Sequence, residues 1–167
     1  MMMAREFTQK INKKYMLKIK EGDQLPVIVG ETQHQDKIDL SSFLGDQNVV
    51  LYFYPKDNTP GCSLEAREFN QLMGDFEKLQ TQVIGVSTDT KVSHTSFCGK
   101  YQLNFPLIAD SDLRISQLLG ALGENGRTTL RITFVIDKKG AVRKIYEDVK
   151  PAGHAKEVLE FLRTSLF

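Results

Sequence analysis

An apolar run from Val49 to Tyr54 constrains the fold more than any other stretch, because its β-branched and aromatic residues predict a buried strand. Pro55 ends the run, and the pair Asp57-Asn58 forms a turn. Thr59 and Pro60 then have the residue types preferred at the N-cap and the first position of a helix. A helix is therefore expected to begin directly after the strand and its turn.

Cys62 falls at the third position of this expected helix. Apolar residues at helical spacing extend the helix from Pro60 to about Leu79 and place Cys62 on its apolar side: Ala66, Phe69, Leu72, Met73, Phe76 and Leu79. A helix N-terminus favours the thiolate form, whereas burial disfavours it. A reactive cysteine here therefore needs an additional cation, and a buried structural cysteine is the alternative.

The rest of the chain alternates between strand-like and helix-like patterns. The expected elements are short strands at 17–19 and 25–29, a hairpin tip at 34–37, a helical turn at 41–45, a strand at 82–87, a helix from 90 to about 101, an extended piece at 105–110, a short helix at 112–119, a hairpin of 130–136 with 142–146, and a terminal helix at 153–166. This order favours an α/β sandwich with a mixed sheet.

Composition limits the classes of partner. The 167 residues are 41% hydrophobic, which suits one domain, and the net charge is +1. The longest apolar run is six residues, too short to span a bilayer. Neither nucleic acid nor a membrane is therefore expected as a partner.

The first 15 residues are polar and basic and are expected to be a disordered leader, with one domain over residues 16–167. The leader has no apolar h-region, which argues against a secretory signal. Two cysteines in such a chain argue against a structural disulfide framework. The expected location is the cytoplasm.

Pro55, Thr59 and Cys62 have the spacing Pro-x-x-x-Thr-x-x-Cys. This spacing resembles the active-site motif of the peroxiredoxins, thiol peroxidases with a thioredoxin-like fold. The wider run from Tyr52 to Cys62 resembles their bacterioferritin-comigratory, or peroxiredoxin Q, branch, and the resemblance covers roughly residues 17–167. It implies a thioredoxin-like α/β fold with a central mixed sheet flanked by helices, and makes Cys62 the peroxidatic cysteine.

Peroxide reduction by a thiol requires a thiolate, an aligned peroxide and donors for the leaving oxygen. Cys62 can supply the thiolate, and the Thr59 hydroxyl can orient the sulfur or a peroxide oxygen. The backbone N–H groups of Gly61 and Cys62 can donate, since the first turn of a helix leaves them free. Pro55 is expected to shape the loop and shield the pocket from water.

The additional cation is expected to be Arg131. Its segment, residues 130–137, resembles the family's strand with the active-site arginine. An arginine stays charged and can also donate to the peroxide, although an outward arginine on a half-exposed strand is the alternative. Glu65, one turn beyond Cys62, also matches the family pattern and is a candidate to orient Arg131, or else a solvated helix residue.

Attack on peroxide leaves Cys62 as a sulfenic acid that a second thiol must resolve. Many relatives in this branch carry that thiol five residues on, where this chain has Arg67. Cys98 lies in the helix after the next strand, a placement that resembles the second variant of the branch and implies an intramolecular disulfide between two helices. Otherwise Cys98 is a buried cysteine without chemical importance, and an external thiol resolves Cys62.

The resemblance thus implies an atypical two-cysteine peroxidase that reduces hydrogen peroxide and organic hydroperoxides. Thioredoxin or a similar dithiol would recycle it, and it would act as a monomer. A redox sensor or holdase switched by the Cys62–Cys98 disulfide is the alternative function.

No cofactor is expected, because the cysteine pair carries the electrons. His34, His94 and His154 lack a ligand spacing, so no metal site is expected either. A Cys-x-x-Cys oxidoreductase is disfavoured because Glu65 occupies the second cysteine's place, and a glutathione peroxidase is disfavoured because the chain has no tryptophan.

Overall fold

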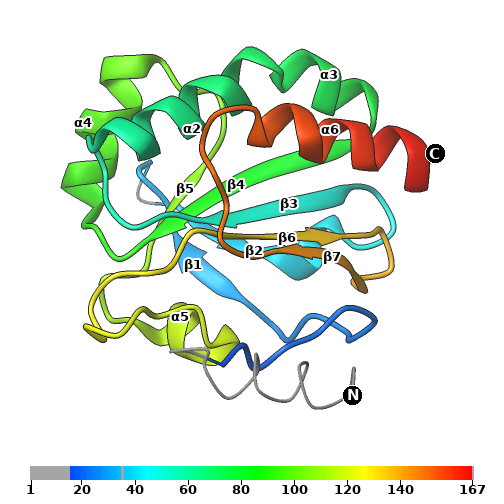
Figure 1. Cartoon of the computed structure of the whole chain (residues 1–167), viewed down its shortest axis with the longest axis horizontal. Coiled ribbons are helices and arrows are strands. Elements are labelled where there is room, and N and C mark those ends of the chain that lie inside the picture. The colour runs from blue at the N-terminus through cyan, green and yellow to red at the C-terminus, as the bar shows by residue number, and fades with distance from the viewer. Residues whose placement is uncertain (1–15, 35, 167) are drawn as a thin grey trace, which may run out of the picture.

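A computed structural model describes residues 16–34 and 36–166, which form a sheet covered by helices (Figure 1). The strands are β1 (Val29–Glu31), β2 (Lys37–Asp39), β3 (Asn48–Phe53), β4 (Thr81–Ser87), β5 (Leu107–Ala109), β6 (Ile132–Ile136) and β7 (Val142–Tyr146). The helices are η1 (Leu40–Phe43, a 3₁₀ turn), α2 (Pro60–Gln71), α3 (Met73–Lys78), α4 (Lys91–Tyr101), α5 (Arg114–Leu119) and α6 (His154–Ser165). The predicted leader, residues 1–15, lies outside the described residues.

The main sheet has five strands in the order β5-β4-β3-β6-β7. Strand β3 pairs parallel with β4 and antiparallel with β6, so the sheet is mixed as expected. Strands β4 and β5 are also parallel, whereas β6 and β7 form an antiparallel hairpin. Strand β3 is therefore central, and the loop after its carboxyl end leads to α2.

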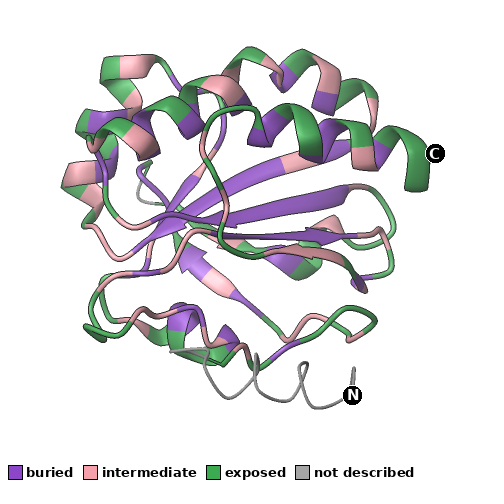
Figure 2. Cartoon of the chain, viewed as in Figure 1, coloured by how far each residue is buried: buried purple, intermediate pink, exposed green. Residues whose placement is uncertain are grey.

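The pleat of β3 divides the core into two layers, because alternate side chains of a strand point to opposite faces. Val50 and Tyr52 belong to a cluster with α2, α3, α4 and α6, whereas Val49, Leu51 and Phe53 belong to a cluster with α5 and the segment before β1. Figure 2 shows the strands buried between the two layers. Cys62 belongs to the first cluster.

The long helix predicted at 60–79 is divided into α2 and α3 at Leu72. The N–H of Leu72 donates to Phe69 O at 3.1 Å, three residues back, so the turn is tighter than an α-helical turn. The break keeps both apolar faces buried, since Phe69, Met73 and Phe76 all reach the core. The predicted continuous helix is therefore wrong at this point.

Two predicted strands near the start of the chain also differ. Residues 17–19 form no strand: Lys18 N donates to Leu119 O at 3.0 Å, and Ile19 is buried without a strand partner. Of the strand predicted at 25–29, only Val29 is in a ladder, since Pro26 has no N–H to donate.

Across residues 16–34 and 36–166, no helix has the length and apolarity needed to cross a membrane.

Candidate active site

Cys62 lies in the first turn of α2 with its thiol turned into the core, and it is 1% exposed. The N–H of Ser63 donates to Thr59 O at 2.9 Å, and this is the first hydrogen bond of the helix. The N–H groups of Gly61 and Cys62 precede that bond, so they have no intrahelical acceptor. The thiol is thus buried beside two backbone donors at the positive end of a helix.

Arg131 supplies the cation beside this thiol. Its Nη2 donates to Cys62 Sγ at 3.3 Å, and its Nη1 donates to Glu65 Oε1 at 2.8 Å. Gly61 allows this approach, because an added Cβ there would lie only 3.2 Å from Nη2. Arg131 directly precedes β6 rather than lying on it, and its backbone oxygen accepts from Val149 N at 3.3 Å.

The electrostatics favour a charged guanidinium between two acceptors. Burial opposes the charge of Arg131, but Glu65 and Cys62 outweigh it and raise the pKa of Arg131. Burial raises the pKa of Glu65 to about 7, although the charge of Arg131 acts in the opposite direction. Glu65 is therefore only partly ionised near neutral pH. Its carboxylate only partly neutralises the positive charge of Arg131, which lies beside Cys62.

Two polar atoms in this region lack a hydrogen-bond partner within residues 16–34 and 36–166: Tyr52 Oη and Glu65 Oε2. Tyr52 stacks on Phe69 at 4.6 Å, so its ring lies under α2. Burial raises the pKa of Tyr52, and the charges of Glu65 and Cys62 add to the effect. Tyr52 therefore stays a neutral phenol beneath the candidate site.

Pro55 and Thr59 flank the loop that leads into α2, and both are half-buried. Thr59 occupies the N-cap position, as predicted, but its side chain does not cap the helix. Its hydroxyl donates to Lys56 O at 2.8 Å instead. The residue before Pro55 is fixed to the Arg131 segment, because Thr129 donates to Tyr54 O at 2.7 Å.

Cys98 lies on α4 and is half-buried, and both it and Cys62 are free thiols. Its Sγ donates to Leu103 O at 3.3 Å and accepts from Gln33 Nε2 at 3.7 Å. Helices α2 and α4 are neighbours, because the guanidinium carbon of Arg67 on α2 lies 5.7 Å from the ring centroid of Tyr101 on α4.

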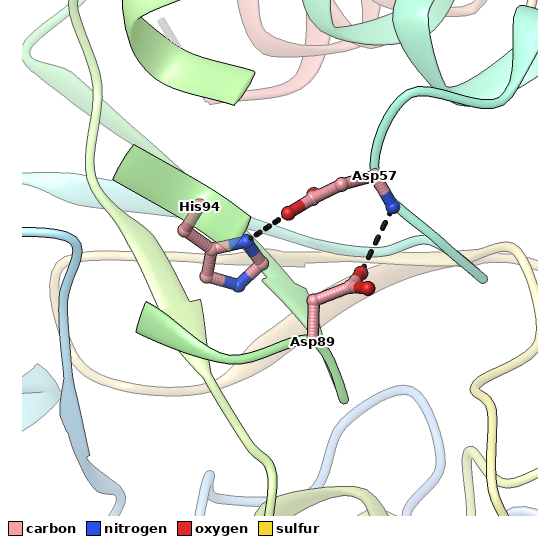
Figure 3. Close-up of side chains that lie close together, drawn as sticks. All are labelled: Asp57, Asp89 and His94. Carbon is pink, nitrogen blue, oxygen red and sulfur yellow. Dashed lines mark hydrogen bonds and ion pairs between the residues drawn. The ribbon is translucent and has the colours of Figure 1, made fainter. Parts of the chain in front are cut away.

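A buried joint connects the active-site loop to the start of α4 (Figure 3). His94 Nδ1 lies 2.7 Å from Asp57 Oδ2, and His94 Nε2 lies 2.9 Å from Ile108 O. A carboxylate and a carbonyl only accept, so the ring donates from both nitrogens and forms an ion pair with Asp57. Asp89 completes the joint by accepting from Asp57 N at 2.9 Å.

The same three side chains place ligand-type atoms within 4.8 Å of one another, although the sequence indicated no metal site. Both ring nitrogens of His94 are engaged, and Asp57 also accepts from Tyr54 and Ser93, at 2.7 and 2.8 Å. Because these atoms already have protein partners, the cluster is explained as a structural joint.

Comparison with known proteins identifies the family of the chain. The AhpC/TSA family model matches residues 21–145. The chain is 40% identical over 153 residues to a putative peroxiredoxin bcp of Helicobacter pylori, covering 88% of this chain and 100% of that one. It is 34% identical over 151 residues to peroxiredoxin Bcp of Escherichia coli, covering 87% and 96%.

Solved structures give the same result. A cysteine-to-serine mutant of PrxQ from Xylella fastidiosa superimposes with a TM-score of 0.84 at 36% identity, covering 89% of this chain and 98% of that one. Peroxidoxin BcpB of Mycobacterium tuberculosis gives 0.82 at 30% identity, covering 88% and 98%. The chain therefore belongs to the AhpC/TSA family and, within it, to the Bcp/PrxQ peroxiredoxins. It is a thiol peroxidase with a thioredoxin-like fold, as the sequence predicted.

The structure brings Cys62, Arg131 and Glu65 into contact, and places Pro55 and Thr59 on the loop beside them. Sequence reasoning missed the joint of Asp57 with His94. One signal was available, since His94 lies four residues before Cys98 and so on the same face of a helix.

Proposed function

We propose that Cys62 is the residue that reduces hydrogen peroxide and organic hydroperoxides. The observation that carries this proposal is the contact of Arg131 with both Cys62 Sγ and Glu65. A guanidinium held by a buried carboxylate stabilises a thiolate and retains further N–H groups for a peroxide oxygen. Cys62 without this cation would be a desolvated thiol of low reactivity.

The thiolate of Cys62 attacks one peroxide oxygen, and the O–O bond breaks as the S–O bond forms. Cys62 becomes a sulfenic acid, and the leaving oxygen takes a proton to give water or an alcohol. Arg131 and the N–H groups of Gly61 and Cys62 stabilise the charge on the two oxygens. Pro55 shields the site, and Thr59 holds the loop through its bond to Lys56 O.

Cys98 then resolves the sulfenic acid by forming an intramolecular disulfide. Support comes from the adjacency of α2 and α4, which share a hydrophobic cluster around both cysteines. A disulfide needs Cα atoms within roughly 7 Å, so the first turn of α2 must unwind to bring Cys62 across. A helix end opens at low cost, because its first N–H groups have no ladder bonds to lose.

Thioredoxin or a similar dithiol would return the disulfide to two thiols, and the enzyme would act as a monomer in the cytoplasm. A cycle that starts from reduced cysteines suits a reducing compartment. The single domain over residues 16–167 carries all the proposed catalytic groups.

One equivalent of hydrogen peroxide, added to the reduced protein and followed by mass spectrometry within seconds, tests the proposal. A Cys62–Cys98 disulfide within one chain, lost in Cys62→Ser, is expected. Sulfenic or sulfinic acid at Cys62 with a free Cys98 would remove the resolving role. Steady-state turnover with thioredoxin separates an enzyme from a redox sensor, which needs only one oxidation.

A further inference from the structure

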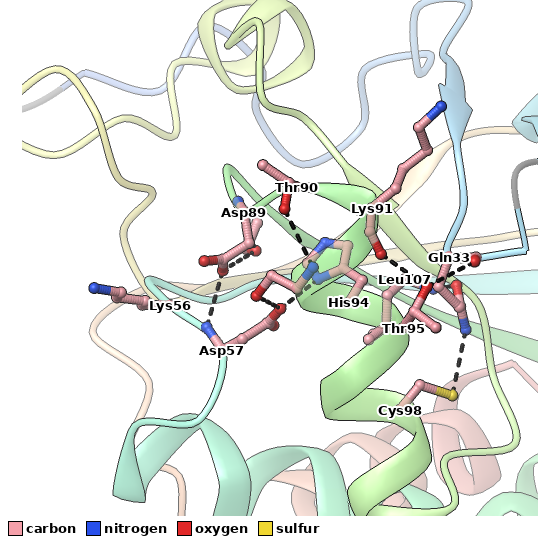
Figure 4. Close-up of polar contacts among 12 residues, drawn as sticks. Gln33, Lys56, Asp57, Asp89, Thr90, Lys91, His94, Thr95, Cys98 and Leu107 are labelled. Carbon is pink, nitrogen blue, oxygen red and sulfur yellow. Dashed lines mark hydrogen bonds and ion pairs between the residues drawn. The ribbon is translucent and has the colours of Figure 1, made fainter.

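Gln33 has no assigned role, and it is buried in the turn that follows β1. It contacts α4 through both its backbone and its side chain (Figure 4). Its backbone oxygen accepts from Thr95 Oγ1 at 3.0 Å, and its Nε2 donates to Cys98 Sγ at 3.7 Å. Gln33, from the β1–β2 hairpin, thus contacts both Cys98 and Thr95, which lies one helical turn before Cys98 on α4.

The orientation of this amide is fixed by its other partners. Gln33 Oε1 accepts from Leu107 N at 2.7 Å, and Nε2 donates to Phe105 O at 3.1 Å. A flipped amide would place a donor against an N–H and an acceptor against a carbonyl. The second hydrogen on Nε2 is therefore the one directed at Cys98 Sγ.

The two contacts of Cys98 respond differently when its proton leaves. The thiol donates to Leu103 O, and a thiolate has no hydrogen for that bond. The bond from Gln33 persists and becomes stronger, because the acceptor is now charged. Deprotonation therefore frees the sulfur from Leu103 while Gln33 continues to hold it.

We propose that Gln33 is a positioning residue for the resolving step, which holds the sulfur of Cys98 and stabilises its thiolate. This inference rests on the proposed function, in which Cys98 attacks the sulfenic acid of Cys62. In that step the Cys98 thiolate forms the S–S bond, and the S–O bond of Cys62 breaks. Hydroxide leaves and takes a proton to become water, so that the sulfenic sulfur is reduced and the thiolate is oxidised.

Gln33→Glu tests the role of the donor, because a carboxylate retains an acceptor for Leu107 N but has no N–H for Phe105 O or Cys98, and its negative charge opposes a thiolate. Gln33→Met removes both functions at similar length. Rapid mixing with hydrogen peroxide, acid quench and mass spectrometry give two rates, for oxidation of Cys62 and for formation of the disulfide. Disulfide formation is expected to slow by roughly 10- to 100-fold in both variants, the effect of one bond to a charged group.

Oxidation of Cys62 is expected to keep its rate, and sulfinic acid at Cys62 should accumulate as the sulfenic acid persists. The pH profile of disulfide formation separates a positioning role from a structural one. Loss of a bond that stabilises the thiolate should move the profile to higher pH, whereas a merely structural change would slow the step equally at every pH. Gln82→Met is the matched control, since the Gln82 amide also donates to a backbone oxygen, Val83 O at 2.9 Å. Disulfide formation at the unvaried rate in the Gln33 variants, or an equal loss in Gln82→Met, would overturn the proposal.

The unvaried chain is measured first, because a chain that forms no Cys62–Cys98 disulfide contradicts the proposed function rather than the role of Gln33 alone. Hydrogen exchange at the Gln33 side-chain amide supplies a test if the Gln33 variants do not fold. Exchange is expected to accelerate at least tenfold in Cys98→Ala, relative to the unvaried chain. An unchanged exchange rate would overturn the proposal.

Discussion

At the scale of single residues, the site depends on Arg131 serving two acceptors at once. A planar guanidinium presents several donors in a fixed fork. The bond to Glu65 therefore fixes the orientation of the Arg131 N–H groups that face Cys62. Cys62 is as buried as an unreactive cysteine, and in the proposed mechanism the guanidinium beside it stabilises the thiolate form. The family resemblance of residues 130–137 predicted Arg131 as the cation, whereas no local pattern predicts a contact between residues 69 positions apart.

Arg131→Lys is expected to slow the oxidation of Cys62 by hydrogen peroxide by about 10- to 100-fold, since it loses a charge-assisted bond. A lysine ammonium is a compact charge that cannot repeat the two-acceptor geometry. Stopped-flow measurement of the second-order rate constant checks this. Arg143→Lys is the control, because Arg143 bonds to Asp137 at 3.3 Å on an exposed surface. Equal rates in both variants would contradict the role of Arg131.

Glu65 predicts a pH dependence of stability. Its pKa is about 7 in the folded chain and 4.5 ordinarily, so the folded state binds the proton more tightly. Its contribution to the free energy of unfolding is therefore complete below pH 4.5 and is lost as the pH rises through about 7. The loss is of the order of 3 kcal/mol. Urea unfolding of Glu65→Gln between pH 4 and 8 should lack this loss, and parallel stability curves for the two proteins would refute the expectation.

At the scale of elements, α4 is held at its start by the buried joint of His94 with Asp57 and at Cys98 by Gln33. The joint connects the loop before α2 to α4, so it fixes one end of the segment that rearranges in the proposed resolving step. In that proposal, the fixed point confines unwinding to the turn that carries Cys62.

His94→Leu is expected to lower the free energy of unfolding by about 3–5 kcal/mol, because it leaves the Asp57 carboxylate buried without its cationic partner. Chemical denaturation followed by circular dichroism measures this. Lys91→Ala removes the exposed bond to Glu31, 2.6 Å, at the same end of α4 and should change stability little. Losses of similar size in the two variants would argue against a buried ion pair.

The elements that sequence predicted well are those with local signals. The strand at β3, the start of α2 and the β6–β7 turn follow from apolar runs, Pro60 and the Asp137–Gly140 segment. The break at Leu72 had one marker in the residue pattern, Gly74 two residues on, because glycine weakens a helix interior. The contact of Gln33 with Cys98 spans 65 positions, and no local pattern predicts which side chains a fold brings together over that distance.

At the scale of the whole molecule, one sheet separates two hydrophobic layers, and both cysteines lie in the layer of α2, α3, α4 and α6. The other layer contains α5 and residues from both β3 and β6, with none of the proposed catalytic side chains. The period-2 alternation of β3 makes this division, and the sequence run from Val49 to Tyr54 predicted its burial without showing the two faces.

Phe69→Ala and Phe134→Ala are expected to lower the free energy of unfolding by similar amounts, about 3–5 kcal/mol, because both rings are fully buried. Only Phe69→Ala should also slow Cys62 oxidation, since Phe69 packs on Tyr52 beneath α2. Peroxide kinetics at a temperature where both variants are folded measure this difference. Equal slowing in both variants would show that the layers are not independent.

The division into layers also bears on how the molecule can be handled. The hollow beside η1 and the β6–β7 turn, about 270 Å³ and lined by Leu25, Val27 and Leu44 among others, opens on the layer without cysteines. An anchor or dye attached there leaves the redox layer facing solution. A surface-bound sensor that reports peroxide through the cysteine pair would therefore be tethered by this side of the sheet.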